Sequence, residues 1–538
     1  MKKYVIALAG LAAAALVSCT REINPASPLD GTLRFTVSRE IPGEGTRAAL
    51  TGTDVVFEAG DAISVFDGNG NKKYVTEAGG ATATFTCASE ADAAAAAEQY
   101  LVLSPYNAEA ALQSPSVIRI TIPEVQTAVP GGVDPKALVS AGIATGNTDV
   151  KLFNAVGLVK VEVPEGLEVK NIQVAGGFGQ NIAICGQYDF NANEESLTLA
   201  PVAGKLSTVI TLVPAEGEST IAPGTYYVAV RPKPDYDGGF TVAFVDGSNQ
   251  LCKRATRTKA DIYRSHILPL GALNTTDYVP VTGKATLRYA DAAPQFTGLI
   301  KQLAGGAGGF TDKDTKIKKI IFKAHTLYSQ EYKGGGNVIS NGPNSTVQIH
   351  AYVKDDIAYV CTEAPIITLY SSSNNLFRDF YALEEVVFDD VNTMSGTTFE
   401  YMFRNCFNLK SVDFGNADFS LVTNYSNMFF NLTNLESVNF GRTAVNPDAN
   451  TSLMMYNARN LKTLKLGPNF SLGKTATRMF DATAQQTSID AAGDDAKKCQ
   501  LYCSQAFYDS VAADHDDDTD AYVNSYFNKH RFTLNVVE

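Results

Sequence analysis

The chain has 538 residues, of which 45% are hydrophobic and 19% are charged, and it carries a net charge of −13 with a pI of about 5. This length accommodates roughly three or four domains, each large enough to bury a core of its own. Binding to nucleic acid needs clusters of Lys and Arg that neutralise phosphates, and none stands out in this acidic sequence, so no nucleic-acid partner is expected.

The first nineteen residues have the pattern of an export signal. Lys2 and Lys3 precede an apolar run, residues 5–17, that is too short to cross a bilayer as a permanent helix. The stretch ending in Cys19, LVSC, resembles a lipobox. This implies removal of residues 1–18, acylation of Cys19, and anchoring to the outer membrane of a Gram-negative bacterium. The alternative is an ordinary secretory signal in which Cys19 occurs by chance.

After a polar tether, residues 19–30, the sequence up to residue 273 indicates β-strands. Apolar and polar side chains alternate with a period of two, for example over Val159, Lys160, Val161, Glu162 and Val163. Short strands separated by Gly- and Pro-rich turns favour two tandem antiparallel β-sandwich domains, 31–150 and 151–273. We expect one short helix, at residues 91–97.

This half of the chain resembles the fimbrillin-like lipoproteins of Gram-negative anaerobes. The resemblance rests on the order of seven segments: Thr46-Arg47-Ala48, 56–66, 100–107, 120–135, 151–163, 223–232 and 238–244. It implies β-sandwich domains that serve as pilus subunits or related surface proteins. In some members an Arg-specific protease removes the N-terminal strand and opens a groove for a neighbour's strand. Arg47 stands where such a cut could fall, although an ordinary loop residue would look the same.

Residues 274–538 depart from the pattern of a shaft pilin, which presents both of its ends for stacking. A large C-terminal extension suits a fimbrial tip subunit or an anchored adhesin. Its first part, 274–369, is interpreted as a β-rich connector and the N-terminal cap of the repeats that follow.

Residues 370–481 repeat with a period of 26. Seven columns match: Met402, Met428 and Met454; Asn405, Asn431 and Asn457; Asn408, Asn434 and Asn460; Leu409, Leu435 and Leu461; Val412, Val438 and Leu464; Phe414, Phe440 and Leu466; Gly415, Gly441 and Gly467. The L-x-x-V-x-F core is typical of a leucine-rich-repeat solenoid of parallel strands with short helices. We expect the Asn columns to form ladders of turns. The segment resembles the BspA-like leucine-rich repeat, in which Cys406 matches the family's Cys, and this implies adhesion at the cell surface.

The outward positions of the predicted strands indicate which surface binds. The first column alternates in sign: Glu384, Lys410, Glu436 and Lys462. We expect it to form a charge ladder that stabilises the solenoid rather than a binding face. Binding is assigned instead to the variable returns 416–425, 442–452 and 468–477, with six candidate residues: Asn416, Asp418, Tyr425, Arg442, Asn446 and Asp448.

The tail, 482–538, is expected to cap the stack. Its acidic run, Asp516 to Asp520, faintly resembles the start of a calcium loop but lacks the sixth-position Gly, so a solvated acidic turn is the preferred interpretation. The seven cysteines after Cys19 are sparse and odd in number, which indicates buried small side chains rather than a disulfide framework. Cys499 and Cys503 alone are not enough for a zinc site. No metal or cofactor is expected.

Three classes of function remain. The first is a non-catalytic, lipid-anchored adhesin or fimbrial tip or accessory protein, whose partners are host or bacterial surface proteins or glycans and other fimbrial subunits. The alternative is a glycan-binding lipoprotein of a polysaccharide-uptake system, although the sequence has no Trp to stack on sugars. An enzyme is not expected, because the motifs G-x-S-x-G and H-E-x-x-H are absent and the five His residues are scattered. A hydrolase that uses a pair of carboxylates stays open, because such pairs are close in space and not in sequence.

Overall fold

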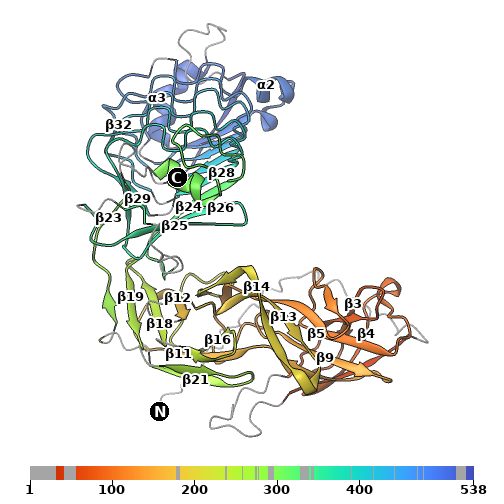
Figure 1. The fold of residues 1–538 in the computed structure, drawn as a ribbon. Helices are drawn as coiled ribbons and strands as arrows, with labels where there is room; N and C mark the ends of the chain where they lie inside the picture. The colour runs from red at the N-terminus through yellow and green to blue at the C-terminus, as the bar shows by residue number, and fades with distance from the viewer. Residues whose placement is uncertain are drawn as a thin grey trace, which may run out of the picture.

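The chain is mainly β, as its alternating pattern predicts, and has an angular shape in which a stack of coils stands on one end of a β-rich first half (Figure 1). The computed structural model describes residues 32–40, 56–176, 182–236, 239–256, 259–272, 276, 278–288, 296–327, 338–340, 344–388, 390–415, 417–441, 443–468, 470–476, 478–516 and 529–537.

The first β region is a closed barrel rather than the predicted two-layered sandwich. Its strands, in order around the barrel, are β1 (Phe35–Arg39), β10 (Asp149–Asn154), β9 (Ser140–Thr145), β5 (Gln99–Ser104), β2 (Ala62–Phe66), β3 (Asn71–Thr76) and β4 (Thr82–Cys87). The barrel closes because β1 lies between β4, with which it is antiparallel, and β10, with which it is parallel. Phe35 and Val37 of β1 are completely buried in the core.

The helix expected at residues 91–97 is absent. Only a single 3-10 turn, η1 (Glu90–Asp92), forms there. Barrel side chains bind the backbone N–H groups that a helix would use: Ala94 N donates to the Tyr74 hydroxyl at 3.0 Å, and Ala97 N donates to the Tyr100 hydroxyl at 2.8 Å. Tertiary hydrogen bonds therefore override the helix propensity of the alanine run.

The second β region contains four sheets. The six-stranded sheet has the order β22 (Val279–Pro280), β19 (Leu251–Ala255), β18 (Phe240–Asp246), β12 (Val169–Gly176), β15 (Val209–Val213) and β8 (Val125–Thr127). The four-stranded sheet has the order β14 (Thr198–Ser207), β13 (Cys185–Asn191), β7 (Val117–Ile122) and β6 (Leu112–Ser114). The two smaller sheets are β16 (Gly224–Val230) with β11 (Gly157–Val163) and β21 (Ile267–Ala272), and β17 (Lys233–Tyr236) with β20 (Ala260–Ile262). Because β6, β7 and β8 precede residue 150 but pair within these sheets, the chain crosses between the two β regions more than once.

The C-terminal half forms a stack of coils around one nine-stranded sheet, called here the coil stack. The strands are β25 (Ile349–Lys354), β26 (Ile357–Thr362), β24 (Lys319–Lys323), β28 (Glu385–Phe388), β31 (Ser411–Asp413), β33 (Ser437–Asn439), β34 (Thr463–Lys465), β35 (Cys499–Cys503) and β36 (Phe532–Val536). All neighbours from β26 onward are parallel. Val386, Val412, Val438 and Leu464 are direct register partners, as the period of 26 predicts.

On the other side of each coil the chain returns through short strands. These are β23 (Ala285–Thr286), β27 (Ile367–Leu369) and β29 (Val391–Thr393), and then β30 (Thr397–Thr398) and β32 (Val422–Asn424). Residues 482–538 do more than cover the end, because they add β35 and β36 together with α2 (Gln485–Ala491) and α3 (Gln505–Asp516). The helix α1 (Phe296–Leu303) packs at the opposite end.

The short helices predicted within the repeats are replaced by successive turns in the described residues of 370–481. The Asn column at 405, 431 and 457 adopts the left-handed conformation, with φ of 64°, 61° and 60°. Four residues earlier a second left-handed column holds Tyr401, Asn427 and Leu453. Two left-handed residues within one turn run break any helix. The Asn columns link neighbouring coils as predicted, since Asn434 Nδ2 donates to the Phe407 carbonyl of the preceding coil at 2.8 Å. The Asn457 amide also donates to the Asn431 side chain, to Oδ1, at 3.0 Å.

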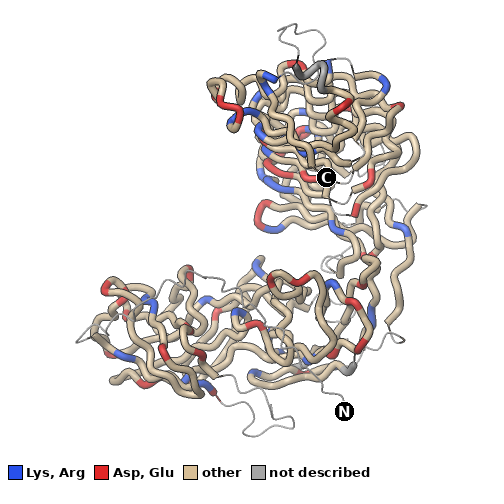
Figure 2. Tube along the Cα trace, turned by 180° about the vertical axis from the view of Figure 1, so that it is seen from behind, with Lys and Arg blue, Asp and Glu red and all other residues tan. Residues whose placement is uncertain are grey.

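The predicted charge ladder is also confirmed, and it is longer than the repeats alone indicate. Six neighbouring strands or strand ends place alternating charges side by side: Asp356, Lys318, Glu384, Lys410, Glu436 and Lys462. Three ion pairs form along it, at 3.4 Å between Lys318 and Asp356, 2.6 Å between Lys410 and Glu384, and 3.0 Å between Lys462 and Glu436. Basic and acidic segments alternate along this side of the stack (Figure 2, left).

The coil stack docks on the second β region through β25 and β26. Leu327 and Tyr352 pack against Ala243 and Val245, the face of β18 that points away from its own core. The buried side chain of Gln173 accepts a hydrogen bond from Leu327 N at 2.7 Å and donates one to the His325 carbonyl at 3.2 Å. Three ion pairs cross the same junction: Lys253 with Glu363, Lys354 with Glu124, and Lys205 with Asp355.

We predict that Gly441→Ala destabilises the coil stack far more than Gly396→Ala. Both glycines are left-handed, at φ of 55° and 74°, which costs an alanine about 1–2 kcal/mol. A Cβ at Gly441 would also lie 2.0 Å from the Gly415 carbonyl oxygen, whereas one at Gly396 would meet nothing within 4 Å. Adding this overpacking, we expect a loss of about 3 kcal/mol or more for Gly441→Ala. Hydrogen exchange of the β31 and β33 amides measures it, and equal effects of the two variants would contradict the close approach of the coils.

We predict that Lys410→Gln lowers the thermal midpoint of the coil stack in a salt- and pH-dependent way. The hydrogen bond from Lys410 holds the pKa of Glu384 below its usual range, and Glu384 raises the pKa of Lys410. The stabilisation is therefore full near neutral pH, and it is lost in acid as the pH falls through the lowered pKa of Glu384. Salt screens this exposed pair, so the difference from the wild type shrinks at high ionic strength. The exposed Lys474→Gln is the control, and a salt-independent loss for Lys410→Gln would refute a charge ladder.

Candidate functional site

Several residues singled out from the sequence lie outside the described residues. These are the acylation site Cys19, the cleavage site Arg47, and the return residues Asn416 and Arg442. The acidic run from Asp516 to Asp520 also falls there, since only the backbone of Asp516 is described. Their predicted roles therefore stay predictions.

The described return residues lie on turns of neighbouring coils. Asp418 is exposed, and its Oδ1 accepts a hydrogen bond from Ser420 N at 3.0 Å. Asn446 accepts one from Asp448 N at 2.9 Å, and Asp448 is exposed. Parallel bridges between Asn392 and Asp418, and between Asn424 and Asn450, keep the returns aligned along the stack. The returns therefore present carboxylates on a locally rigid backbone.

Tyr425 does not belong to this exposed set. Its side chain is completely buried, and its hydroxyl donates to the Phe419 carbonyl at 2.7 Å. Burial raises its pKa, so the group stays neutral. Its ring packs edge-on against Phe399. The sequence placed Tyr425 in a return because it precedes the matched columns, but the chain has already turned into the core there.

The outer face of the nine-stranded sheet is occupied by its own side chains. Besides the charge ladder, Asn439 Nδ2 donates to Asp413 Oδ1 at 3.0 Å across neighbouring strands, and Lys319 pairs with Glu385 at 2.7 Å. This agrees with the expectation that the sheet face stabilises the stack. Internal pairing leaves fewer of its polar groups available to a ligand.

A second exposed surface was not anticipated from the sequence. It is formed by the turn runs 400–408, 426–434, 452–460 and 478–482, and is called here the turn face. Phe430 stacks on Tyr456 with ring centres 5.0 Å apart, and Tyr401 contacts Phe430 edge-on at 6.3 Å. Arginines flank this row at each end: the Arg404 guanidinium lies 5.9 Å from the Tyr401 ring centre, and that of Arg478 lies 5.0 Å from the Tyr456 ring centre.

The sequence did carry a signal for this row. The position after Phe403, Phe429 and Met455 holds Arg404, Phe430 and Tyr456, which are large side chains at a position that the buried columns do not need. Those residues recur at the period of 26, so they lie on one line along the stack. Phe407 lies on the same face and is 47% exposed.

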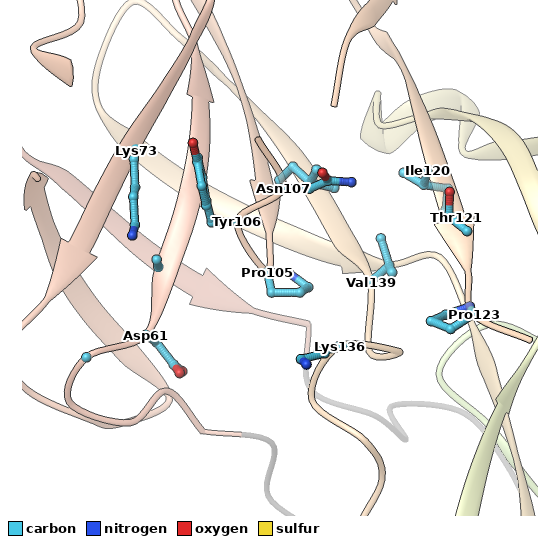
Figure 3. A pocket seen from close by; sticks show the side chains of 13 residues that line it. Asp61, Lys73, Pro105, Tyr106, Asn107, Ile120, Thr121, Pro123, Lys136 and Val139 are labelled. Carbon is cyan, nitrogen blue, oxygen red and sulfur yellow. The ribbon is translucent and has the colours of Figure 1, made fainter. Parts of the chain in front are cut away.

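The β-rich half contains a cavity of about 500 Å³ (Figure 3). Its walls come from the barrel and from β7, and its labelled side chains include Asp61, Lys73, Tyr106, Thr121 and Lys136. The Lys73 ammonium lies 5.2 Å from the Tyr106 ring centre. Asp61 Oδ2 accepts a hydrogen bond from Glu58 N at 3.0 Å, so its carboxylate is held locally. The cavity can admit a small polar molecule, but its charged groups do not converge on one point in Figure 3.

Six of the seven cysteines in the described part of the chain are buried, which confirms their reading as small core side chains. Cys406 Sγ lies 2.9 Å from the Phe377 carbonyl oxygen, and burial raises its pKa. Within the same part, no group of three or more His, Cys, Asp or Glu is arranged to hold a metal ion. None of the described helices has the length and apolar character needed to cross a membrane.

We predict that Tyr425→Phe costs stability but leaves ligand binding unchanged. The variant removes the hydroxyl and leaves the buried Phe419 carbonyl without that donor, which costs about 1–3 kcal/mol. Asp418→Ala, on the exposed part of the same return, should change stability by no more than about 0.5 kcal/mol. Urea unfolding of both variants checks this, and a stable Tyr425→Phe protein with altered binding would return Tyr425 to the surface set.

No protein-family profile matches the chain, and a search of curated proteins finds no significant match. Among solved structures, a "putative cell adhesion protein" from Bacteroides uniformis is 14% identical, with a TM-score of 0.30 over 47% of this chain and 97% of that one. A fimbrial protein from Bacteroides ovatus is 11% identical, with a TM-score of 0.20 over 49% and 54%. A fimbrial assembly protein from Parabacteroides distasonis is 12% identical, with a TM-score of 0.21 over 46% and 93%. At these identities and TM-scores the comparisons assign neither a fold nor a function to this chain.

Proposed function

We propose that the chain is a non-catalytic surface protein, anchored by lipid at Cys19, that serves as an adhesin or as a tip or accessory subunit of a fimbrium. The β-rich half is the stalk, and the coil stack, read as BspA-like leucine-rich repeats, is the interaction module. The observation that best supports this proposal is the junction of the stack with the stalk, which is formed by Gln173, an apolar contact and three ion pairs. A module fixed in this way presents the same exposed surfaces in every molecule.

The distribution of charge on the stack supports this role. The sheet face is internally paired, while Asp418 and Asp448 on the returns are exposed and lie on aligned turns. Exposed polar residues on loops held by a rigid scaffold are the usual place for binding. The chemistry of the turn face, with aromatic rings and guanidinium groups, supports glycans as a second class of ligand.

The fimbrial variant of the proposal depends on β1. A cut after Arg47 would separate residues 19–47, which include β1, from the rest of the barrel. Phe35 and Val37 of β1 are completely buried, and Arg39 donates to Ser104 Oγ at 3.1 Å. Removing β1 would therefore expose unpaired edges on β4 and β10 that a strand of another subunit can cover.

We predict that Cys19→Ala moves the protein from the membrane fraction to the soluble fraction of the producing cell. The variant lacks the thiol that the lipid needs, while the described fold does not involve residue 19. Metabolic labelling with a fatty acid and fractionation measure the change. Cys87→Ala, which removes a half-buried thiol of the barrel, is the control and should remain in the membrane fraction.

The same strains test adhesion. Cells producing the wild-type chain should adhere to a host-matrix or partner-cell surface, and cells producing Cys19→Ala should not, although the released protein keeps its binding. Asp418→Ala with Asp448→Ala should weaken adhesion without changing the amount of protein on the cell. If cells that produce the chain grow better on a polysaccharide but do not adhere, the function is that of a glycan-binding lipoprotein of a polysaccharide-uptake system.

A further inference from the structure

We propose that the turn face of the coil stack binds a linear polysaccharide that carries carboxylate or sulfate groups. The inference deepens the proposed function and rests on the role of the stack as a binding module. It assigns a surface and a chemical class of ligand that the variable returns do not supply, because the exposed return residues Asp418 and Asp448 are acidic.

The aromatic rings and arginines of the turn face form a continuous row. A chain of side-chain contacts crosses successive coils, with each residue touching the next: Arg404, Tyr401, Phe430, Tyr456 and Arg478. The three rings are half-buried, and both guanidinium groups are exposed. Parallel strands lie about 4.8 Å apart, so Arg404, Phe430 and Tyr456, which share one position of the repeat, lie on neighbouring coils at about that spacing. A continuous straight row of this kind fits an extended linear polymer better than an irregular protein loop.

Side-chain amides lie beside this row. Asn405, Asn431 and Asn457 run parallel to it, and Asn431 is exposed. Asn405 Nδ2 donates to Asp379 Oδ1 at 2.6 Å and Asn457 Nδ2 donates to Asn431 Oδ1 at 3.0 Å, so a ligand meets the remaining hydrogen-bonding capacity of these amides. Amides donate to and accept from sugar hydroxyls, and the edges of Tyr and Phe rings pack against their apolar C–H faces. Phe407, which is 47% exposed, and the exposed Arg459 widen the surface on the same side.

The turn face also carries exposed positive charges. The whole chain carries −13, yet the turn face holds the exposed arginines Arg404, Arg459 and Arg478. Arg478 pairs with Asp481 at 2.7 Å, and Arg459 donates to the uncharged Gln485 at 2.9 Å. Arg404 contacts the Tyr401 ring, and no ion pair forms from it within the described residues. Glu400 is the half-exposed acidic residue nearby. Guanidinium groups bind carboxylate and sulfate through paired hydrogen bonds, which favours an anionic glycan over a neutral one.

The test uses the purified full chain in a solid-phase binding assay with three polymers: hyaluronate, chondroitin sulfate and neutral dextran. We expect saturable binding to one or both charged polymers, weaker binding at high salt, and none to dextran. Arg404→Gln should weaken binding about tenfold, the effect of losing one charge-assisted hydrogen bond. Lys284→Gln removes one exposed positive charge from the connector instead, outside both the returns and the turn face, and should leave affinity within about twofold of the wild type.

Phe430→Leu is the second variant, because it keeps an apolar side chain in the stack but removes the ring that stacks on Tyr456. It should also weaken binding, while the thermal midpoints of all variants stay close to the wild type. Equal binding to dextran, stronger binding to single-stranded polynucleotide, or equal losses for Arg404→Gln and Lys284→Gln would overturn the proposal. Cells that adhere through the chain while the purified protein ignores both charged polymers would overturn the glycan assignment and leave the adhesive function standing.

Discussion

The structure depends on one constraint: a coil of 26 residues cannot bury its own apolar face. Val412 and Phe414 are buried only because the coils before and after supply Val386, Val438, Phe388 and Phe440. Each coil must therefore lie at strand spacing from the next, which fixes the left-handed turns and the close approach of Gly441 to Gly415. The ends of such a stack need covering, and the chain supplies α1 and β25 at one end and α3 with β36 at the other.

The covered first end also determines how the stack is held. Strand β18 is buried on both faces, one in the core of the second β region and one against Leu327 and Tyr352. Gln173 lies in that second contact and accepts a hydrogen bond from Leu327 N, so a polar side chain fixes the register of an otherwise apolar junction. The ion pairs around it are partly exposed and add orientation more than stability. The stack is consequently part of one continuous body with its stalk.

The local periodicity of the sequence predicts much of this fold. The elements that it does not predict depend on contacts between residues far apart in the chain. The period of 26 predicted the parallel strands, the buried columns and the charge ladder, because each depends on neighbouring coils with nearly the same sequence. It did not predict the closed barrel, since the parallel pairing of β1 with β10 joins segments more than a hundred residues apart. Alanines 93–97 showed helix propensity, but the hydroxyls of Tyr74 and Tyr100 bind their backbone. The docking face of β18 had a signal, because Ala243 and Val245 are apolar where alternation would place polar residues.

The same reasoning separates the surfaces of the stack by function. A column of alternating charges is satisfied by its neighbours, so its repetition serves the fold, as with Lys410 between Glu384 and Glu436. The row from Arg404 to Arg478 crosses the same coils, but its two arginines have the same sign and aromatic rings lie between them. Two like charges do not stabilise each other, whereas both attract an anionic polymer that lies along the row. Alternation of charge therefore identifies the structural face of the stack, and its absence distinguishes the turn face, to which we assign the anionic glycan.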